Sequence, residues 1–300
     1  MKYQMKNISI LCLLLFVISI WYGCEDVIEV EPQFSDPQLV VDAWISNEMK
    51  EQKITLRASQ QYFDNSSPIG LSGATVTVTR QDGEVFNFTE GSQSGDYLWS
   101  PTTNSTLGDF GDQFTLQIEI DGEVFQAEST LNRVPPIDSI TQEFEENEVF
   151  RDDGIYVQFF ARDIEGLGDA YWIKTFKNDT FLNNANQLNI AFDAGFDSGS
   201  QVDGIIFIPP IRTFINELDE DSAEIPWTQG ERVKVELHSI NQEAFNFLEI
   251  ARDQILNGDN GIFSLPLANT RTNITNLSGG LKPLGMFNVS GVTSLSYTIE

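Results

Sequence analysis

The chain has few cysteines, histidines and basic residues. Its 300 residues include two cysteines, one histidine and 17 lysines and arginines, against 45 aspartates and glutamates. An electrostatic field of that sign repels nucleic acid and anionic lipid headgroups, so we expect neither as a partner. Solubility explains so acidic a surface better than recognition of a ligand does.

The scarcity of histidine and cysteine excludes several kinds of site. His238 is the only histidine, and no cysteine follows Cys24. The commonest nucleophile–base pairs and zinc sites therefore cannot be assembled from the rest of the chain. His238 ends a predicted strand, where we expect a structural role. No glycine-rich phosphate-binding motif is present. We expect a non-enzymatic protein with no cofactor and no assigned metal site.

Long hydrophobic runs are also missing, apart from one near the start. Lys2 and Lys6 precede a mainly apolar stretch of thirteen residues at 8–20, in which only Ser9 and Ser19 are polar. This is well short of the roughly 20 residues that a membrane-spanning helix needs. A basic start, a short apolar stretch and small residues before a cut are typical of a secretory signal. Residues 1–23 are predicted to be a signal peptide.

The end of that signal predicts a lipid anchor. Gly23-Cys24 resembles the lipobox of bacterial lipoproteins, although Trp21 stands where leucine is usual. Cys12 lies inside the apolar run, so the mature chain would keep only Cys24, and a lipidated cysteine needs no disulfide partner. An ordinary secreted protein is the less favoured alternative. Removing Lys2 and Lys6, and no acid, changes the net charge from −28 to −30. Residues 24–37 read as an acidic tether.

Residues 38–134 show almost purely period-two hydrophobicity, the pattern of half-buried strands. Asp82-Gly83 and Asp121-Gly122 supply the residues that tight hairpin turns require. Several short strands in about a hundred residues are typical of an immunoglobulin-like β-sandwich. The strands are expected at residues 39–45, 53–57, 74–80, 84–88, 95–99 and 113–120.

Pro135-Pro136 interrupts this pattern, since proline cannot donate to a strand ladder, and we place a domain boundary there. Residues 135–300 are expected to form a second β-rich domain with one helix near residues 240–257. Ser239 with Gln242 fits a capping box at its start, and Gly258 a stop at its end. The strands are expected at residues 154–160, 170–176, 204–208, 232–238, 285–289 and 293–299.

Three kinds of candidate site remain as hypotheses. Residues 163–169 and 257–261 group oxygen ligands with glycines, as calcium loops do, but plain turns explain both better. Asp-Ser-apolar triplets make Ser139 and Ser222 candidate O-glycan acceptors. A sugar-stacking surface could use the aromatic residues, although those in strands are more often core residues; Trp227, in a loop, is expected to be the most exposed of Trp44, Trp99, Tyr171, Trp172 and Trp227.

The order of several segments resembles a known family. The segments are residues 39–46, 72–78, 95–97 and 134–140, Asp163 with Gly166 before Tyr171-Trp172, and residues 230–240, 272–276 and 285–287. In that order they are similar to the bacterial lipoprotein family called domain of unknown function 4249. The resemblance implies an outer-membrane lipoprotein, often encoded beside a TonB-dependent transporter of the starch-utilisation type. The family has no established catalytic residues, so the resemblance assigns none to this chain.

The sequence thus favours an accessory or binding lipoprotein of an uptake system, anchored through Cys24 and facing the cell exterior. The acidic residues just after Cys24 look like the surface-export signal of such lipoproteins. Its expected partners are the membrane, through the lipid, and a TonB-dependent barrel. A structural or adhesive surface lipoprotein is the alternative. A glycosidase is less favoured: it needs only two carboxylates, but spacing in the sequence does not place any two of them across a bond.

Overall fold

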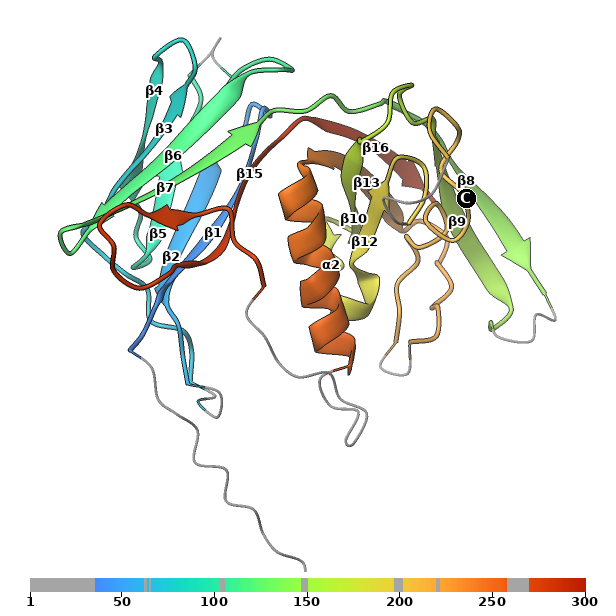
Figure 1. Ribbon diagram of the computed structural model, residues 1–300. Helices are drawn as coiled ribbons and strands as arrows, with labels where there is room; N and C mark the ends of the chain where they lie inside the picture. Colours follow the sequence, from blue (N-terminus) through green and yellow to red (C-terminus); the bar gives the residue numbers. More distant parts are fainter. Residues whose placement is uncertain are drawn as a thin grey trace, which may run out of the picture. The chain divides into compact units, whose positions relative to one another are not determined.

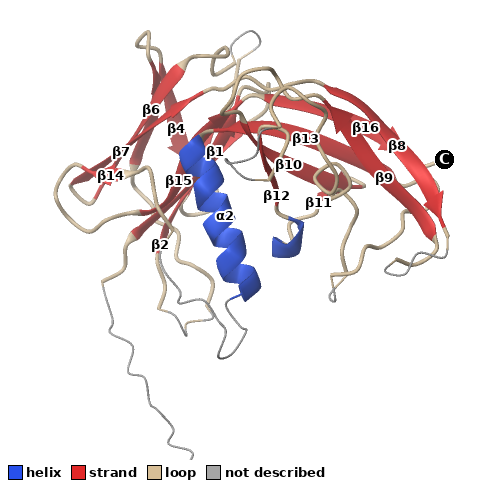
Figure 2. Ribbon diagram, turned by 45° about the vertical axis from the view of Figure 1, so that its right-hand side comes forward, coloured by secondary structure: helices blue, strands red, loops and turns tan. Residues whose placement is uncertain are grey.

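The computed structural model describes residues 36–61, 64, 66–102, 106–146, 151–196, 202–219, 222–257 and 270–300. Within these ranges the chain is mainly β with one α-helix (Figures 1 and 2). The predicted mainly β fold class is confirmed. The expected signal peptide at 1–23, Cys24 and almost all of the expected tether at 24–37 lie outside the described residues.

The first sheet has nine strands in the order β14-β7-β6-β3-β4-β5-β2-β1-β15. The strands predicted between residues 38 and 131 are confirmed to within two residues at each end, and the hairpin at Asp121-Gly122 is present, with both residues at positive φ. The strands are β1 (Leu39–Ser46), β2 (Gln52–Ala58), β3 (Thr75–Arg80), β4 (Val85–Glu90), β5 (Asp96–Trp99), β6 (Gln113–Ile120), β7 (Glu123–Thr130), β14 (Thr275–Asn276) and β15 (Leu284–Ser290).

This sheet curls around a core built from its inward-facing residues. Alternate residues of each strand point inward, as the period-two pattern requires. The inward residues of β1 to β7 and β15 belong to one apolar cluster. β4 joins the part of the sheet that contains β3 to the part that contains β5, since it pairs with β3 at one end and with β5 at the other. Ser129 on β7 accepts a hydrogen bond from Val289 N on β15, 2.9 Å, which links the two sides.

Two strands from late in the chain complete this sheet. β14 pairs antiparallel with β7, and β15 pairs parallel with β1 over seven residue pairs. Gly285, the second residue of β15, has a φ of 97°, and a Cβ placed there would lie 1.9 Å from Val41 O. Only glycine therefore fits where β15 meets β1. Chain from beyond residue 135 is thus built into the sheet that residues 38–134 begin.

The second sheet has the order β11-β10-β13-β16, and β12 also pairs with β10. One of its faces packs on the hairpin of β8 and β9 around a second core, in which Phe159, Tyr171 and Leu237 are fully buried. The strands are β8 (Ile137–Glu145), β9 (Gly154–Ala161), β10 (Ala170–Lys177), β11 (Thr180–Phe181), β12 (Asn189–Phe192), β13 (Arg232–Ile240) and β16 (Val292–Thr298); a short 3-10 helix, η1 (Ala185–Gln187), precedes β12.

The predicted helix is confirmed as α2 (Gln242–Asn257). It lies beside β12 and β10 (Figure 1) and buries Ala244, Phe245 and Leu248 in a third apolar cluster. Its expected cap is wrong. Asn241, not Ser239, caps the helix, because Asn241 Oδ1 accepts from Ala244 N at 2.7 Å. Gly258 lies outside the described residues.

Ser239 is instead a residue of β13 that ties three segments together. Its hydroxyl donates to Asn132 O and accepts from Gly291 N, both at 2.8 Å. The strand predicted at residues 204–208 is also wrong. That segment makes one isolated bridge, Ile206 with Arg162, and Pro209-Pro210 follows, where missing N–H groups prevent a ladder from continuing.

Candidate functional site

A groove lies between the outer face of the first sheet and the face of the second sheet that looks away from the β8–β9 hairpin. Its volume is about 480 Å³, within the usual range of small-ligand sites, about 300–1,000 Å³. We call it the inter-sheet groove. Its lining comes from β1, β2 and the loop before β2 on one side, and from β10, β11 and β13 on the other: Asp42, Trp44, Ser46, Lys50, Glu51, Gln52, Lys53, Thr55, Trp172, Lys174, Phe176, Phe181, Glu236 and His238.

Strand alternation explains why these residues meet. Residues 41, 43 and 45 of β1 fill the first core, so Asp42, Trp44 and Ser46 face outward. On β10, residues 171 and 173 fill the second core, which turns Trp172 and Lys174 the other way. The period of two thus gives each sheet a polar and aromatic face toward the groove.

Aromatic rings form one part of the groove. Trp44 and Trp172 meet edge to face with centroids 5.2 Å apart, a favourable geometry for two rings. The ring centroid of Phe181 lies 6.5 Å from that of Trp172 and 5.3 Å from that of Phe176. Trp44 also contacts Phe247 of α2. Helix packing therefore holds the tryptophan pair in place, while both side chains stay partly exposed.

Two charged groups in the groove have no hydrogen-bond or ion-pair partner among the described residues, Asp42 and Lys174. Lys174 Nζ lies 3.9 Å from the ring centroid of Trp172. Burial lowers the pKa of Lys174 to about 8, although the charge of Glu236 opposes that shift. Burial raises the pKa of Asp42, against the opposing charges of Lys53 and Lys174. Protein walls surround the Asp42 side chain, but the groove is open on one side, so water still reaches it.

Glu236, by contrast, is fully engaged. Its two oxygens contact Lys234 Nζ at 2.7 Å and His238 Nε2 at 2.9 Å. Burial raises the pKa of Glu236, but these hydrogen bonds outweigh burial and lower it well below its usual range. Burial lowers the pKa of His238 to about 4. Because a carboxylate can only accept, neutral His238 carries its proton on Nε2.

The first candidate calcium segment contributes to an acidic cluster, in a different arrangement from the one its sequence indicated. Asp163 is joined by Asp193 and Asp203, with carboxylate oxygens within 4.8 Å of one another. Asp169, at the other end of the segment, pairs instead with Arg133, whose Nε lies 3.1 Å from both of its oxygens. Of the second segment, only Asn257 belongs to the described residues.

Hydrogen bonds within the protein account for this acidic cluster. Asp163 accepts from the Tyr171 hydroxyl at 2.6 Å and from Gly204 N at 3.1 Å. Asp193 accepts from Gly168 N at 2.8 Å, and Asp203 from Gly166 N at 2.9 Å. Burial raises the pKa of Asp163. The three carboxylates thus fasten the loops around residues 166 and 204 to each other.

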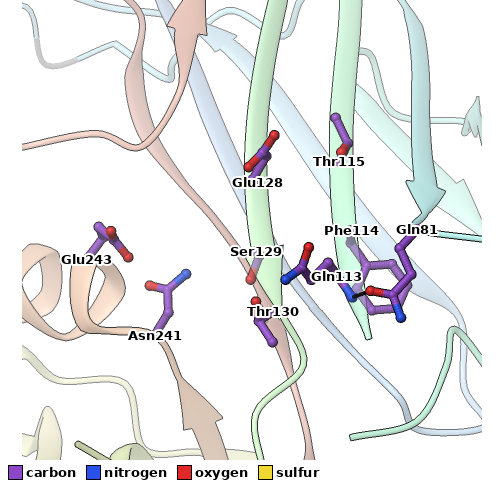
Figure 3. A pocket seen from close by; sticks show the side chains of 9 residues that line it. All are labelled: Gln81, Gln113, Phe114, Thr115, Glu128, Ser129, Thr130, Asn241 and Glu243. Carbon is purple, nitrogen blue, oxygen red and sulfur yellow. Dashed lines mark hydrogen bonds between the residues drawn. The ribbon is translucent and has the colours of Figure 1, made fainter. Parts of the chain in front are cut away.

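A second pocket, of about 360 Å³, lies where β6 and β7 approach the start of α2. Asn241 and Glu243 face Glu128 and Thr130 across it (Figure 3). Gln113 N donates to Gln81 Oε1 on its far side. Its lining is more polar than that of the inter-sheet groove, and Phe114 is the one aromatic residue among the described residues that line it.

The comparison with known proteins gives a family. The family model described as Domain of unknown function (DUF4249) matches residues 25–296. The chain belongs to this family. None of the curated proteins matches its sequence. In the described part of this DUF4249 chain, no helix is long and apolar enough to cross a membrane.

The other aromatic candidates of this DUF4249 chain lie away from the groove. Trp227, expected to be the most exposed, is only 3% exposed. Its ring N–H donates to Asn216 Oδ1 at 3.0 Å and its backbone N–H donates to Ile155 O, so it extends the second core beside β9. Tyr171 is fully buried, and Trp99 packs on Phe86 in the first core.

The modification candidates have different surroundings. Ser139 is half-buried on β8, and Ser222 lies exposed in a turn, where it accepts a hydrogen bond from Asn186. The sequence did not single out Asp42, Lys174 or Glu236. A usable signal was present, since Trp172 and Lys174 are two residues apart on a predicted strand and must share a face.

Proposed function

We propose that this protein is a non-enzymatic lipoprotein of a bacterial outer membrane, anchored through Cys24 and facing the cell exterior. It serves as a binding or accessory component of a TonB-dependent uptake system of the starch-utilisation type, and the inter-sheet groove is its ligand site. The observation that carries the binding role is the combination of paired tryptophans with two charged groups, Asp42 and Lys174, that have no partner among the residues the structure describes. Such convergent aromatic and polar groups are typical of ligand pockets.

The other carboxylates of the groove already have partners in the protein, which supports binding of a ligand over its hydrolysis. A glycosidase needs two carboxyl groups facing the scissile bond, one of them protonated. In the groove, Glu236 is held ionised by Lys234 and His238, and Glu51 accepts a hydrogen bond from Ser100 at 3.3 Å. Both oxygens of Glu236 are thus already bound within the protein, so Glu236 does not offer a free nucleophile or base opposite Asp42.

Location and partner are tested in living cells. Palmitate labelling is expected in the native protein and lost in Cys24→Ala, and protease added to intact cells is expected to remove the native protein. Labelling that survives the substitution would overturn the anchor. Affinity purification of the native protein from detergent-solubilised membranes is expected to recover a TonB-dependent barrel.

The binding role has its own readout. Deletion of the gene is expected to impair growth on the nutrient of the uptake system, and complementation with Trp44→Ala is expected to restore protein level but not growth. Glu146→Gln, an exposed change far from the groove in sequence, serves as the control. A deletion that leaves uptake intact and spoils attachment to surfaces would favour the structural or adhesive class instead.

A further inference from the structure

The charged groups of the inter-sheet groove balance within a strongly acidic chain. Its lining holds three carboxylates, Asp42, Glu51 and Glu236, and three ammonium groups, at residues 50, 53 and 174. Three minus three leaves no net charge, while the whole chain carries −28. A ligand with an anionic group is therefore not repelled locally, and a ligand without net charge is not repelled by the rest of the molecule.

Most of these groups already have partners. Lys53 Nζ contacts Asp96 at 3.4 Å, and Lys50 pairs with Glu48. Glu51 accepts from Ser100, and Glu236 from Lys234 and His238. Asp42 on β1 and Lys174 on β10 remain, one on each wall of the groove. An ammonium and a carboxylate thus face the same space from opposite sheets without forming an ion pair with each other.

Resting on the proposed function, we infer that the inter-sheet groove binds a short peptide with free ends. The ligand's terminal ammonium pairs with Asp42, its terminal carboxylate pairs with Lys174, and its apolar side chains contact Trp44 and Phe181. The groove's volume of about 480 Å³ suits a ligand of a few residues rather than a long chain. No covalent step is involved.

The cost of the two unpartnered charges favours this class of ligand over a neutral one. Removing a charged group from water is unfavourable unless it gains a partner of opposite charge or hydrogen bonds. A zwitterion supplies both opposite charges at once, and charge-assisted hydrogen bonds are about twice as strong as neutral ones. A neutral sugar would contact the tryptophans equally well but would offer hydroxyl groups to both charges.

The test uses the native full-length protein in detergent and follows tryptophan fluorescence and calorimetry. The probes are alanyl-phenylalanine, its N-acetyl form and its C-terminal amide, with a neutral maltotriose as the sugar. Alanyl-phenylalanine is expected to bind, and each blocked form to bind about tenfold more weakly or worse, since a hydrogen bond to a charged group contributes about 1.5–3 kcal/mol.

Two substitutions then assign the ends. Asp42→Asn is expected to bind the free and the N-acetyl peptides equally well while still binding the amide more weakly. Lys174→Met is expected to bind the free peptide and the amide equally well while still binding the N-acetyl form more weakly. Glu146→Gln and Lys282→Gln are the matched controls and are expected to keep both. Circular dichroism shows whether each variant is folded, and the selective pattern cannot arise from general unfolding.

The outcomes separate this inference from the proposed function. Equal binding of free and blocked peptides would overturn the assignment of Asp42 and Lys174. Binding of maltotriose alone, lost in Trp44→Ala, would overturn the peptide class and leave the groove as the ligand site. Binding of none of the probes, with uptake unaffected by Trp44→Ala, would overturn both.

Discussion

The ammonium of Lys174 lies 3.9 Å from the ring centroid of Trp172, two residues earlier on the same strand. A cation over an indole face is stabilised by the ring quadrupole, but here it has no anionic hydrogen-bond partner among the described residues. The stacked pair places a positive charge inside a mainly aromatic wall. Such a charge lowers stability while it prepares the groove for a negatively charged ligand group.

Lys174→Met is therefore expected to stabilise the ligand-free protein at pH 7. Burial lowers the folded pKa of Lys174 to about 8, so between pH 8 and about 10.4 the unfolded chain binds more protons. The charged group's cost is fully present below pH 8 and disappears above that window. Urea unfolding should show a gain on the order of 1–3 kcal/mol at pH 7 that shrinks toward pH 10. Lys282→Met should show no such gain.

His238 is expected to make the protein acid-sensitive. Its folded pKa is lowered to about 4 by burial, against about 6.5 in an unfolded chain. The unfolded state therefore binds more protons as the pH falls from 6.5 to 4, and stability is lost over that window, on the order of 1–3 kcal/mol. His238→Gln can still donate to Glu236 but cannot titrate. If wild type and His238→Gln lose stability equally between pH 6.5 and 4.5, another group is responsible.

Gly285 and Gly230 form a matched pair for testing the junction of β15 with β1. Both have positive φ, 97° and 88°, but a Cβ at Gly285 would lie 1.9 Å from Val41 O, while one at Gly230 meets nothing within 4 Å. Gly230→Ala is expected to cost about 1 kcal/mol. Gly285→Ala should cost about 3 kcal/mol or more, because the two strands must separate. Similar melting temperatures for the two variants would contradict the pairing of β1 with β15.

The helix cap and the β13 serine should also differ in their effects. Asn241→Ala removes the cap of α2 and is expected to cost about 1 kcal/mol. Ser239→Ala leaves Asn132 O and Gly291 N without their hydroxyl partner inside the protein and should cost about 1–3 kcal/mol. Helical circular dichroism should fall only in Asn241→Ala. A helical loss in Ser239→Ala alone would restore the capping box expected from the sequence.

Local sequence predicted most strands because their residues alternate between a buried and an exposed face. The prediction failed where the tertiary surroundings of a residue differ from what the local sequence suggests. Residues 204–208 have the apolar composition of a strand, but Pro209-Pro210 stops pairing, and Ile205 and Ile206 remain exposed while Phe207 is buried. Trp227 looked like an exposed loop residue, but β9 offers it a backbone partner and Asn216 a side-chain partner.

Sequence by itself determined the mainly β class, the helix at residues 242–257 and the faces on which Trp44 and Trp172 lie, since strand and helix periods are local properties of the chain. It also contains the features that predict a lipid anchor at Cys24. Only the tertiary structure decided that β15 pairs with β1 and that Asp42 and Lys174 face one groove. Those relationships depend on pairing between segments more than a hundred residues apart, where hydrogen bonding and burial of both sheets must be satisfied together.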